Sequence, residues 1–372
     1  MDTGTFAIIL IVILALAVGA FFVLRSTVDT PAADDEDDTQ TAAAPSTVIE
    51  RTQTDTGGTA TWMYPRGEFD SMTEAGRKSC VAAYSLHHLW SGYKGPVAKI
   101  RRLGDGKQEN FYADSSAELR TTSNKTLKDW LKEYDGPAVP EIVIWYDQSG
   151  NNQHTEVERN TSPTRIERRD DGRREGWQIR FTGTDVIKIG AANRNNPLKD
   201  YADFTISLTA KWEDKPWATG LWIGQPGNDS SVRKSSIFIG NYSTSGRYSF
   251  IYGGNVDERQ VVSNRQTPET MNSKEVPFTN FIMVAKSKSK SLTEIRGYID
   301  GAGFNTNTAG VVYSGPPPNN IRADHDVLYL GGHSNMTGGA ESRPIVGKVT
   351  DLIIFATPLV SSDWTRMASY NN

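Results

Sequence analysis

Nineteen consecutive apolar residues close to the amino terminus leave this part of the chain few ways to fold. The run from Phe6 to Leu24 reads FAIILIVILALAVGAFFVL. As a helix it would span roughly 28 Å, close to the hydrocarbon thickness of a bilayer. A helix is also the form in which a single stretch of chain satisfies its backbone groups in lipid. We therefore predict a transmembrane anchor within residues 1–25, whose apolar positions include Phe6, Ile9, Ile13, Leu16, Phe21 and Leu24.

A cleaved signal peptide is the competing interpretation of this run. Signal peptides usually carry Lys or Arg before the apolar segment, whereas the charged groups before this run are Asp2 and the terminal amine. The apolar residues also continue past the small residues Gly19 and Ala20. A retained single-pass anchor is therefore favoured. Arg25 follows the run, and Cys80 is the only cysteine in the chain. Both features favour the cytoplasmic side of the membrane for the large domain.

Residues 26–60 differ in composition from the rest of the chain. They contain the acidic cluster Asp34–Asp38 and many Thr, Ala, Gly and Pro residues, but few large apolar side chains. Such a segment cannot bury enough surface to offset its ordering entropy, so we predict a disordered, solvated tether. Docking of the acidic cluster on a basic partner surface is the alternative.

The remaining residues, 61–372, have the composition of a globular domain. The formal net charge of −4, with both signs mixed, gives no broad basic field and argues against a nucleic-acid partner. The sequence has no phosphate-binding loop, no dinucleotide fingerprint and no serine-hydrolase or zinc-protease motif. The five histidines lack the spacing of metal ligands. We therefore predict neither a cofactor nor a metal.

Short strands separated by turn residues dominate this domain. Residues 61–176 form a mixed entry part, with helices expected at 77–93 and from Ser123 or Asn124 to 134, and strands at 97–113 and 141–146. Residues 177–372 form the expected core, ending in a short helix at 361–370. We read Arg165–Arg174 as a charged, solvated loop. The strands expected in the core are 177–181, 204–212, 220–223, 236–239, 248–252, 280–285, 294–299, 327–330 and 348–355.

This pattern predicts a mainly β fold: an antiparallel two-sheet jelly-roll sandwich with a few short helices, preceded by one transmembrane helix. The second half resembles the concanavalin A-like lectin/glucanase (laminin-G-like) sandwich. The segments that carry this resemblance are Phe204–Ile206, Gly297–Gly301, Leu328–Gly332, Gly347–Phe355 and Pro358–Ser361.

The first half resembles the opening of the fungal-type α-L-arabinofuranosidase catalytic domain. The matching residues are Cys80–Leu86, Tyr93–Pro96, Ala98–Arg102 and Trp145–Gly150 with His154 behind them. That family's domain is built on the same sandwich, so the two resemblances agree and together cover most of residues 78–370.

Glycosidase activity does not follow from this resemblance. A retaining glycosidase needs two carboxylates about 5 Å apart. The family's nucleophile lies in a stretch with paired cysteines and a glutamate, and the corresponding region here, Ser236–Ser243, has neither. Asp214, Asp229, Asp257 and Glu258 lie nearby, but in polar loops where a solvated carboxylate is the default. We therefore expect no catalytic residues and no enzyme.

A ligand site, if present, is predicted at two places. The polar turn after the strand 141–146 could cradle a sugar or a cation through side-chain oxygens, although such residues more often form an Asx turn. Tryptophans near residue 217 could stack on sugar rings, although tryptophan in a sandwich usually lies in the core. The candidate ligand-binding residues are Trp145, Asp147, Gln148, Asn151, His154, Trp217 and Trp222.

Three classes of function remain. Domains with the Tyr146–Gly150 signature and no catalytic carboxylate motif look similar to ones in virion proteins of large DNA viruses. This resemblance implies a non-enzymatic minor capsid protein that links an internal membrane to neighbouring capsid or coat proteins, with its lipid contact at residues 6–24. The first alternative is a membrane-tethered, lectin-like glycan-binding module. The second is an arabinofuranosidase-like glycoside hydrolase.

Overall fold

The computed structural model describes a large part of the chain from residue 67 onward. The anchor at 6–24, the tether at 26–60 and Trp217 lie outside the described residues. No helix within the described residues is long and apolar enough to cross a membrane. The described residues are 67–158, 164–169, 176–182, 185–190, 197–198, 201, 203–212, 219–224, 236–241, 247–253, 259–266, 278–288, 291–300, 302–303, 311–313, 328–330 and 346–363.

The described residues are mainly β, with a few short helices. The helices are η1 (Glu68–Ser71), α2 (Glu74–Lys78) and α3 (Leu127–Lys132). The strands up to residue 212 are β1 (Cys80–Ser85), β2 (Ala98–Leu103), β3 (Gln108–Ala113), β4 (Leu119–Arg120), β5 (Val139–Trp145), β6 (Glu156–Glu158), β7 (Arg165–Arg168), β8 (Trp177–Thr182), β9 (Val186–Ile189) and β10 (Phe204–Trp212). The later strands are β11 (Thr219–Gly224), β12 (Ser236–Asn241), β13 (Arg247–Gly253), β14 (Arg259–Gln266), β15 (Thr279–Lys288), β16 (Ser291–Ile299), β17 (Ala302–Gly303), β18 (Val311–Tyr313), β19 (Leu328–Leu330) and β20 (Val346–Phe355).

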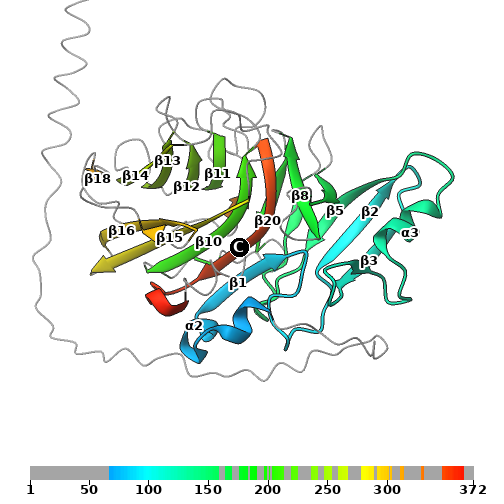
Figure 1. The fold of residues 1–372 in the computed structure, drawn as a ribbon, viewed down its shortest axis with the longest axis horizontal. Coiled ribbons are helices and arrows are strands. Elements are labelled where there is room, and N and C mark those ends of the chain that lie inside the picture. The colour runs from blue at the N-terminus through cyan, green and yellow to red at the C-terminus, as the bar shows by residue number, and fades with distance from the viewer. Residues whose placement is uncertain are drawn as a thin grey trace, which may run out of the picture. The chain divides into compact units, whose positions relative to one another are not determined.

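Two antiparallel sheets organise the described strands (Figure 1). One has 12 strands, in the order β17-β16-β15-β10-β20-β8-β7-β5-β2-β3-β4, with β1 paired to β20 off this path. The other has 8 strands, in the order β18-β14-β13-β12-β11-β19-β9-β6. Strand β20 pairs with β10 along one edge, while its other edge is shared by β8 and β1. This central position makes β20 the strand on which distant parts of the chain meet.

The main hydrophobic core contains the facing sides of the two sheets. Ile206 and Leu208 of β10 belong to the same buried cluster as Ile237, Ile239 and Phe250 of the smaller sheet. Alternate residues of a strand point to opposite faces, so every second residue of β10 enters this core. Full burial of each such side chain stabilises the fold by about 1.5–3 kcal/mol.

A second apolar cluster lies on the other face of the 12-stranded sheet, which we call the outer face. Phe69 of η1, Met72 and Leu89 pack there with Ile353 and Phe355 of β20. The rings of Phe69 and Phe355 lie 6.1 Å apart, centroid to centroid. The amino-terminal segment of the domain thus covers one part of the outer face with apolar side chains.

The helix expected over residues 77–93 is wrong. The helix α2 ends at Lys78, and Cys80–Ser85 forms strand β1, which pairs with β20 from Phe355 to Asp351. All residues of β1 except Val81 are buried. A strand buried on both faces shows no alternation of apolar and polar residues, and chance apolar spacing then imitates a helix.

The loop expected over Arg165–Arg174 is also wrong in its first part. Residues Arg165–Arg168 form β7, which pairs with β8 and with β5. Ile166 faces the core, and the charged residues around it alternate with it. Strands with one buried position and several charges lack the composition by which strands are usually recognised.

Several other predictions are confirmed. The strands on either side of Gly104–Gly106 are β2 and β3, and β10 has the expected bounds. The expected second helix is α3, but its cap is Thr126, whose hydroxyl accepts a hydrogen bond from the Asp129 amide. Residues 361–363 begin the expected final helix, and the rest of it lies outside the described residues.

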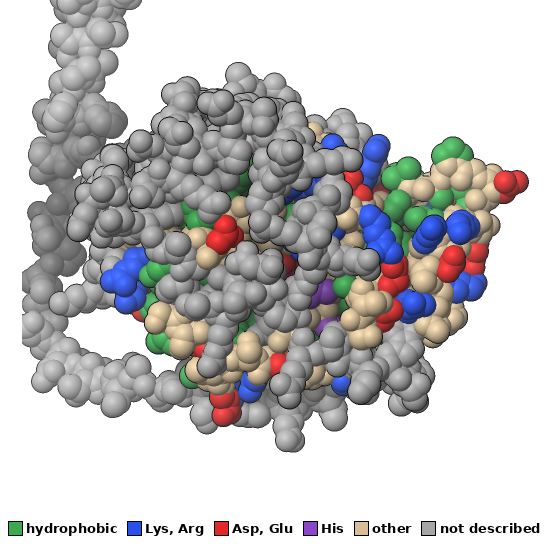
Figure 2. Space-filling view, viewed as in Figure 1, with side chains coloured by type: hydrophobic (Ala, Val, Ile, Leu, Met, Phe, Trp, Pro, Cys, Tyr) green, Lys and Arg blue, Asp and Glu red, His purple; other side chains and the backbone are tan. Residues whose placement is uncertain are grey.

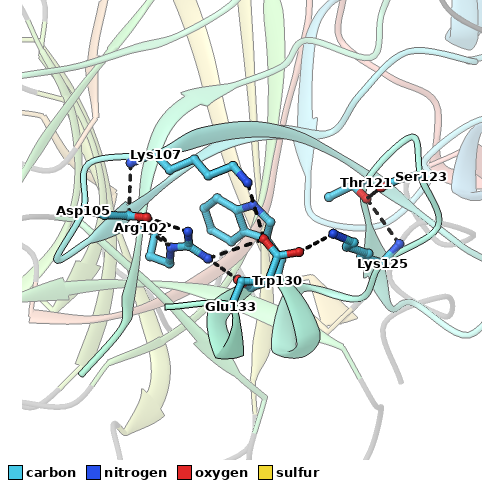
Figure 3. A network of polar contacts seen from close by, with 8 residues as sticks. All are labelled: Arg102, Asp105, Lys107, Thr121, Ser123, Lys125, Trp130 and Glu133. Carbon is cyan, nitrogen blue, oxygen red and sulfur yellow. Dashed lines mark hydrogen bonds and ion pairs between the residues drawn. The ribbon is translucent and has the colours of Figure 1, made fainter. Parts of the chain in front are cut away.

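Charged side chains gather over the end of the domain formed by β2, β3 and α3 (Figure 2). Arg102 on β2 donates to the Trp130 carbonyl oxygen on α3, and Figure 3 shows it between Asp105 and Glu133. The Arg102 Nε lies 3.0 Å from Asp105 Oδ1, and Arg102 Nη1 lies 3.8 Å from a Glu133 oxygen. The guanidinium also covers the Trp130 ring at 4.7 Å. Arg102 therefore ties α3 to the hairpin β2–β3.

Candidate functional site

A row of buried polar side chains crosses the outer face, beside the apolar cluster. Ser85 of β1 pairs with Asp351 of β20, Asp351 with Thr209 of β10, and Thr209 with Asn280 of β15. We call these four residues the polar row. None is more than 2% exposed. Four strands place polar groups side by side where an apolar face would stabilise the fold more, so the row is a candidate functional site.

Two acceptor oxygens of the polar row receive no hydrogen bond from the described residues. The Asn280 amide nitrogen donates to the Thr209 hydroxyl at 3.2 Å and to the Ser207 hydroxyl at 3.1 Å. The Thr350 hydroxyl donates to Asp351 Oδ2 at 2.8 Å. Asp351 Oδ1 and Asn280 Oδ1 are buried without a hydrogen-bond partner among the described residues. Buried acceptors without partners cost free energy, so the row is suited to a ligand that brings hydroxyl donors.

His87 lies against this row from the segment after β1. Its Nδ1 is 2.7 Å from the Ser85 hydroxyl and 3.5 Å from Asp351 Oδ1. Both neighbours approach the same ring nitrogen. A Ser–His–Asp relay needs the serine on one ring nitrogen and the carboxylate on the other. The group is therefore not arranged as a nucleophilic triad, and it presents a hydroxyl, an imidazole and a carboxylate for polar recognition.

The predicted turn after β5 holds the segment that carries Ser85 and His87. Asp147 is 1% exposed and accepts hydrogen bonds from the backbone amides of Ala83, Ser149 and Gln153, at 2.8, 2.9 and 3.0 Å. The Ser149 hydroxyl donates to it as well, at 2.8 Å. Burial raises the pKa of the Asp147 carboxyl, and these hydrogen bonds oppose the shift. Asp147 thus forms an Asx turn and joins it to β1.

Gln148 extends this connection towards the polar row. Its side-chain oxygen accepts from the Leu89 amide at 2.9 Å, and its nitrogen donates to the carbonyl oxygens of Ser85 and His87, at 3.1 and 2.9 Å. Asn151 donates to the Cys80 carbonyl oxygen at 2.9 Å. The turn therefore positions His87 over Asp351, and its own polar groups bind backbone.

The other candidate ligand residues lie in different surroundings. Trp145 is fully buried in the main core, 5.5 Å from the Tyr84 ring. His154 accepts from the Asp147 amide through Nδ1 at 3.1 Å, and burial lowers its pKa. Trp222 lies on β11, in the 8-stranded sheet, and Trp217 is outside the described residues. The structure brings Trp145, Asp147, Gln148, Asn151 and His154 together at one turn, and ligand contact by these residues stays a prediction.

Sequence reasoning missed Asp351, the residue at the centre of the polar row. The available signal was a single acidic residue inside the apolar run of β20, because a charged side chain is rarely buried unless it is paired or binds a ligand. No group of three or more His, Cys, Asp or Glu residues in the described part of the chain is arranged to hold a metal ion.

His88, next to His87, gives a pH dependence that can be measured. His88 is 1% exposed, and burial together with the neighbouring His87 lowers its pKa to about 4. Below its ordinary pKa of 6.5, the unfolded chain binds a proton at this site that the folded chain does not. Stability should therefore fall by about 2 kcal/mol between pH 8 and pH 5. Urea unfolding across this range should show a shallower fall for His88→Gln, and an equal fall would contradict the assignment.

Comparison with known proteins finds a similar fold in solved arabinofuranosidase structures. An arabinofuranosidase complexed with arabinofuranosyl-α-1,2-xylobiose is 15% identical and has a TM-score of 0.52, with 81% of this chain and 64% of that chain covered. A mutant GH54 α-L-arabinofuranosidase soaked with 4-nitrophenyl α-L-arabinofuranoside is 16% identical, with the same TM-score and coverage. At this identity the likeness shows the fold alone. The chain thus spans less than two thirds of the length of these structures.

No family model matches the chain. No curated protein matches it either. The expectation that the chain is not an enzyme is contradicted by the fold that it shares with the arabinofuranosidases. That expectation rested on one missing sequence motif and on carboxylates in loops. Buried carboxylates also occur on strands of the 12-stranded sheet here, Asp351 on β20 and Glu141 on β5.

Proposed function

We propose that this chain is a membrane-tethered, concanavalin A-like sandwich that binds a glycan at the polar row. The observation that carries the proposal is the pair of buried acceptors, Asp351 Oδ1 and Asn280 Oδ1, which lack hydrogen-bond partners among the described residues. Sugar hydroxyls are donors that would satisfy both. The fold shared with enzymes solved in complex with arabinofuranosyl compounds supports the choice of ligand class.

The proposal also includes the membrane anchor, the tether and the side of the membrane on which the domain lies. We propose that residues 6–24 anchor the chain, that residues 26–60 give the domain reach, and that the domain lies on the cytoplasmic side. A link between a membrane and a capsid shell, expected from the sequence, has no support among the matched structures. Glycan binding therefore replaces it as the main proposal.

Binding is tested with the full-length chain in detergent, by titration calorimetry with arabinofuranosyl-α-1,2-xylobiose. We expect saturable binding that Asp351→Asn weakens by about tenfold or more, because a hydrogen bond to a charged group contributes about 1.5–3 kcal/mol. Asp129→Asn is the matched control, since the Asp129 side chain is 61% exposed. Equal affinity of the two variants would remove the polar row from the site, and no binding of any glycan, neutral or acidic, would overturn the proposal.

Hydrolysis of a glycoside is the second candidate function. The shared fold with arabinofuranosidases favours it, and a buried carboxylate on β20 supplies a group of the required type. Incubation with 4-nitrophenyl α-L-arabinofuranoside tests it by the release of nitrophenolate. Release that is lost in Asp351→Asn but kept in Asp129→Asn would make hydrolysis the main function. No release, together with binding, leaves a lectin-like module.

A further inference from the structure

Two lysines face each other on the outer face, on the same two strands as the centre of the polar row. Lys211 of β10 pairs directly with Lys348 of β20, two positions along β10 from Thr209. Neighbouring residues Ala210 and Trp212 belong to the main core, so Lys211 points to the opposite, outer face. Lys211 is 4% exposed and Lys348 is 5% exposed. Like charges directly opposite in an antiparallel pair repel each other and destabilise it.

Among the described residues, a carboxylate lies within ion-pair distance of Lys348 but not of Lys211. Lys348 Nζ lies 3.0 Å from Glu167 Oε1. The Glu167 carboxylate is shared with Gln178, which donates to it at 2.9 Å, and with Arg180, 3.4 Å away. The Lys211 side chain forms no ion pair or hydrogen bond with another described residue. A buried ammonium group without a counter-charge is costly, and an anion bound beside it would offset that cost.

Other charged residues of the outer face form ion pairs among the described residues. Along the outer face, β5 and β2 place Glu141 against Arg101 at 3.0 Å, so this pair is already balanced. Glu167 lies within ion-pair distance of both Lys348 and Arg180. Lys211 and Lys348 therefore place two positive charges next to each other in a chain whose formal net charge is −4.

We propose that Lys211, supported by Lys348, binds an acidic group of the glycan, a carboxylate or a sulfate, while the polar row binds its hydroxyls. This inference rests on the proposed function and specifies the class of ligand: an anionic glycan. The arrangement suits such a ligand because Lys211 and Thr209 lie on one strand and one face, about 7 Å apart. One sugar unit can contact both positions.

The test compares a glucuronic-acid-bearing oligosaccharide, a sulfated one and their neutral, carboxyl-reduced counterpart on the full-length chain. Binding of the acidic ligand should be at least tenfold tighter and should weaken with added salt. Lys211→Met should abolish this preference while leaving the affinity for the neutral ligand within about twofold. Lys132→Met is the control, because the Lys132 side chain is 66% exposed, and it should bind as the unaltered chain does.

Unfolding temperatures, measured with and without ligand, show whether a loss of binding comes from a folding defect. Lys211→Met should raise the unfolding temperature of the ligand-free chain, since it removes an unbalanced buried charge, and the acidic oligosaccharide should stabilise the unaltered chain more than the variant. Preference for the sulfated over the glucuronate ligand would identify the anion as sulfate. Equal binding of acidic and neutral ligands would overturn this inference and leave the proposed function standing, whereas no binding of any glycan would overturn both.

Discussion

Replacing Asp147 with alanine is expected to destabilise the domain by about 3–5 kcal/mol. The carboxylate accepts hydrogen bonds from three backbone amides and one hydroxyl, and it is 1% exposed. Alanine leaves these donors buried without an acceptor, and each such donor costs about 1–3 kcal/mol. Because the Ala83 amide belongs to β1, the attachment of the turn to the 12-stranded sheet is lost as well. Equilibrium unfolding in urea measures the change.

Two variants separate this effect from a general loss of charge. Asp147→Asn keeps the shape but presents an amide nitrogen to a backbone donor, so it should destabilise almost as much as alanine. Asp135→Asn changes an exposed carboxyl and should shift stability by less than 0.5 kcal/mol, as surface substitutions do. If Asp147→Ala behaved like Asp135→Asn, the turn would not hold β1.

Arg102→Ala is expected to give the second largest loss, about 2–3 kcal/mol. Arg102 is 3% exposed as a residue. Its guanidinium donates to the Trp130 carbonyl oxygen and lies over the Trp130 ring. Its removal leaves a cavity beside Trp130 and two acidic side chains with less compensation (Figure 3). We place the loss below that of a fully buried ion pair because the Asp105 and Glu133 side chains are about 30% exposed. Urea unfolding again provides the measurement.

A spectroscopic signal distinguishes the lost ion pair from a lost packing contact. The hydrogen bonds from Arg102 hold the pKa of Asp105 at about 2. In Arg102→Ala this pKa should rise towards its ordinary value, which carboxyl NMR titration can follow. Arg102→Lys should restore part of the charge effect but little of the stability, since an ammonium cannot reproduce the forked contacts of a guanidinium. An unchanged Asp105 pKa would contradict the assignment.

The sequence allowed the β-rich fold and many strands to be predicted because those strands carry a local signal. β10 and β20 alternate or run continuously apolar between turn residues, and their bounds were close to those observed. β1 was missed because its residues are buried on both faces, and helical spacing could be read into them by chance. What makes β1 a strand is the free edge of β20, which only the folded chain provides.

One part of the candidate site could be predicted from the sequence and the other could not. The turn at Asp147–Asn151 was recognisable as a polar segment after an apolar strand, and the Asx turn was the default interpretation of it. The polar row could not be predicted, because Ser85, Thr209, Asn280 and Asp351 are brought together by strand pairing across 266 positions of sequence. Their register exists only in the assembled sheet.

The most direct test of the central claim is to map where a glycan contacts the full-length chain. A photoreactive arabinofuranosyl oligosaccharide, with free ligand as competitor, labels the residues at its binding site, and mass spectrometry identifies the peptides. Our account predicts competed labels in peptides that contain residues 85–89, 205–212 and 346–355. Competed labels confined to the end formed by β2, β3 and α3, residues 98–132, would contradict it.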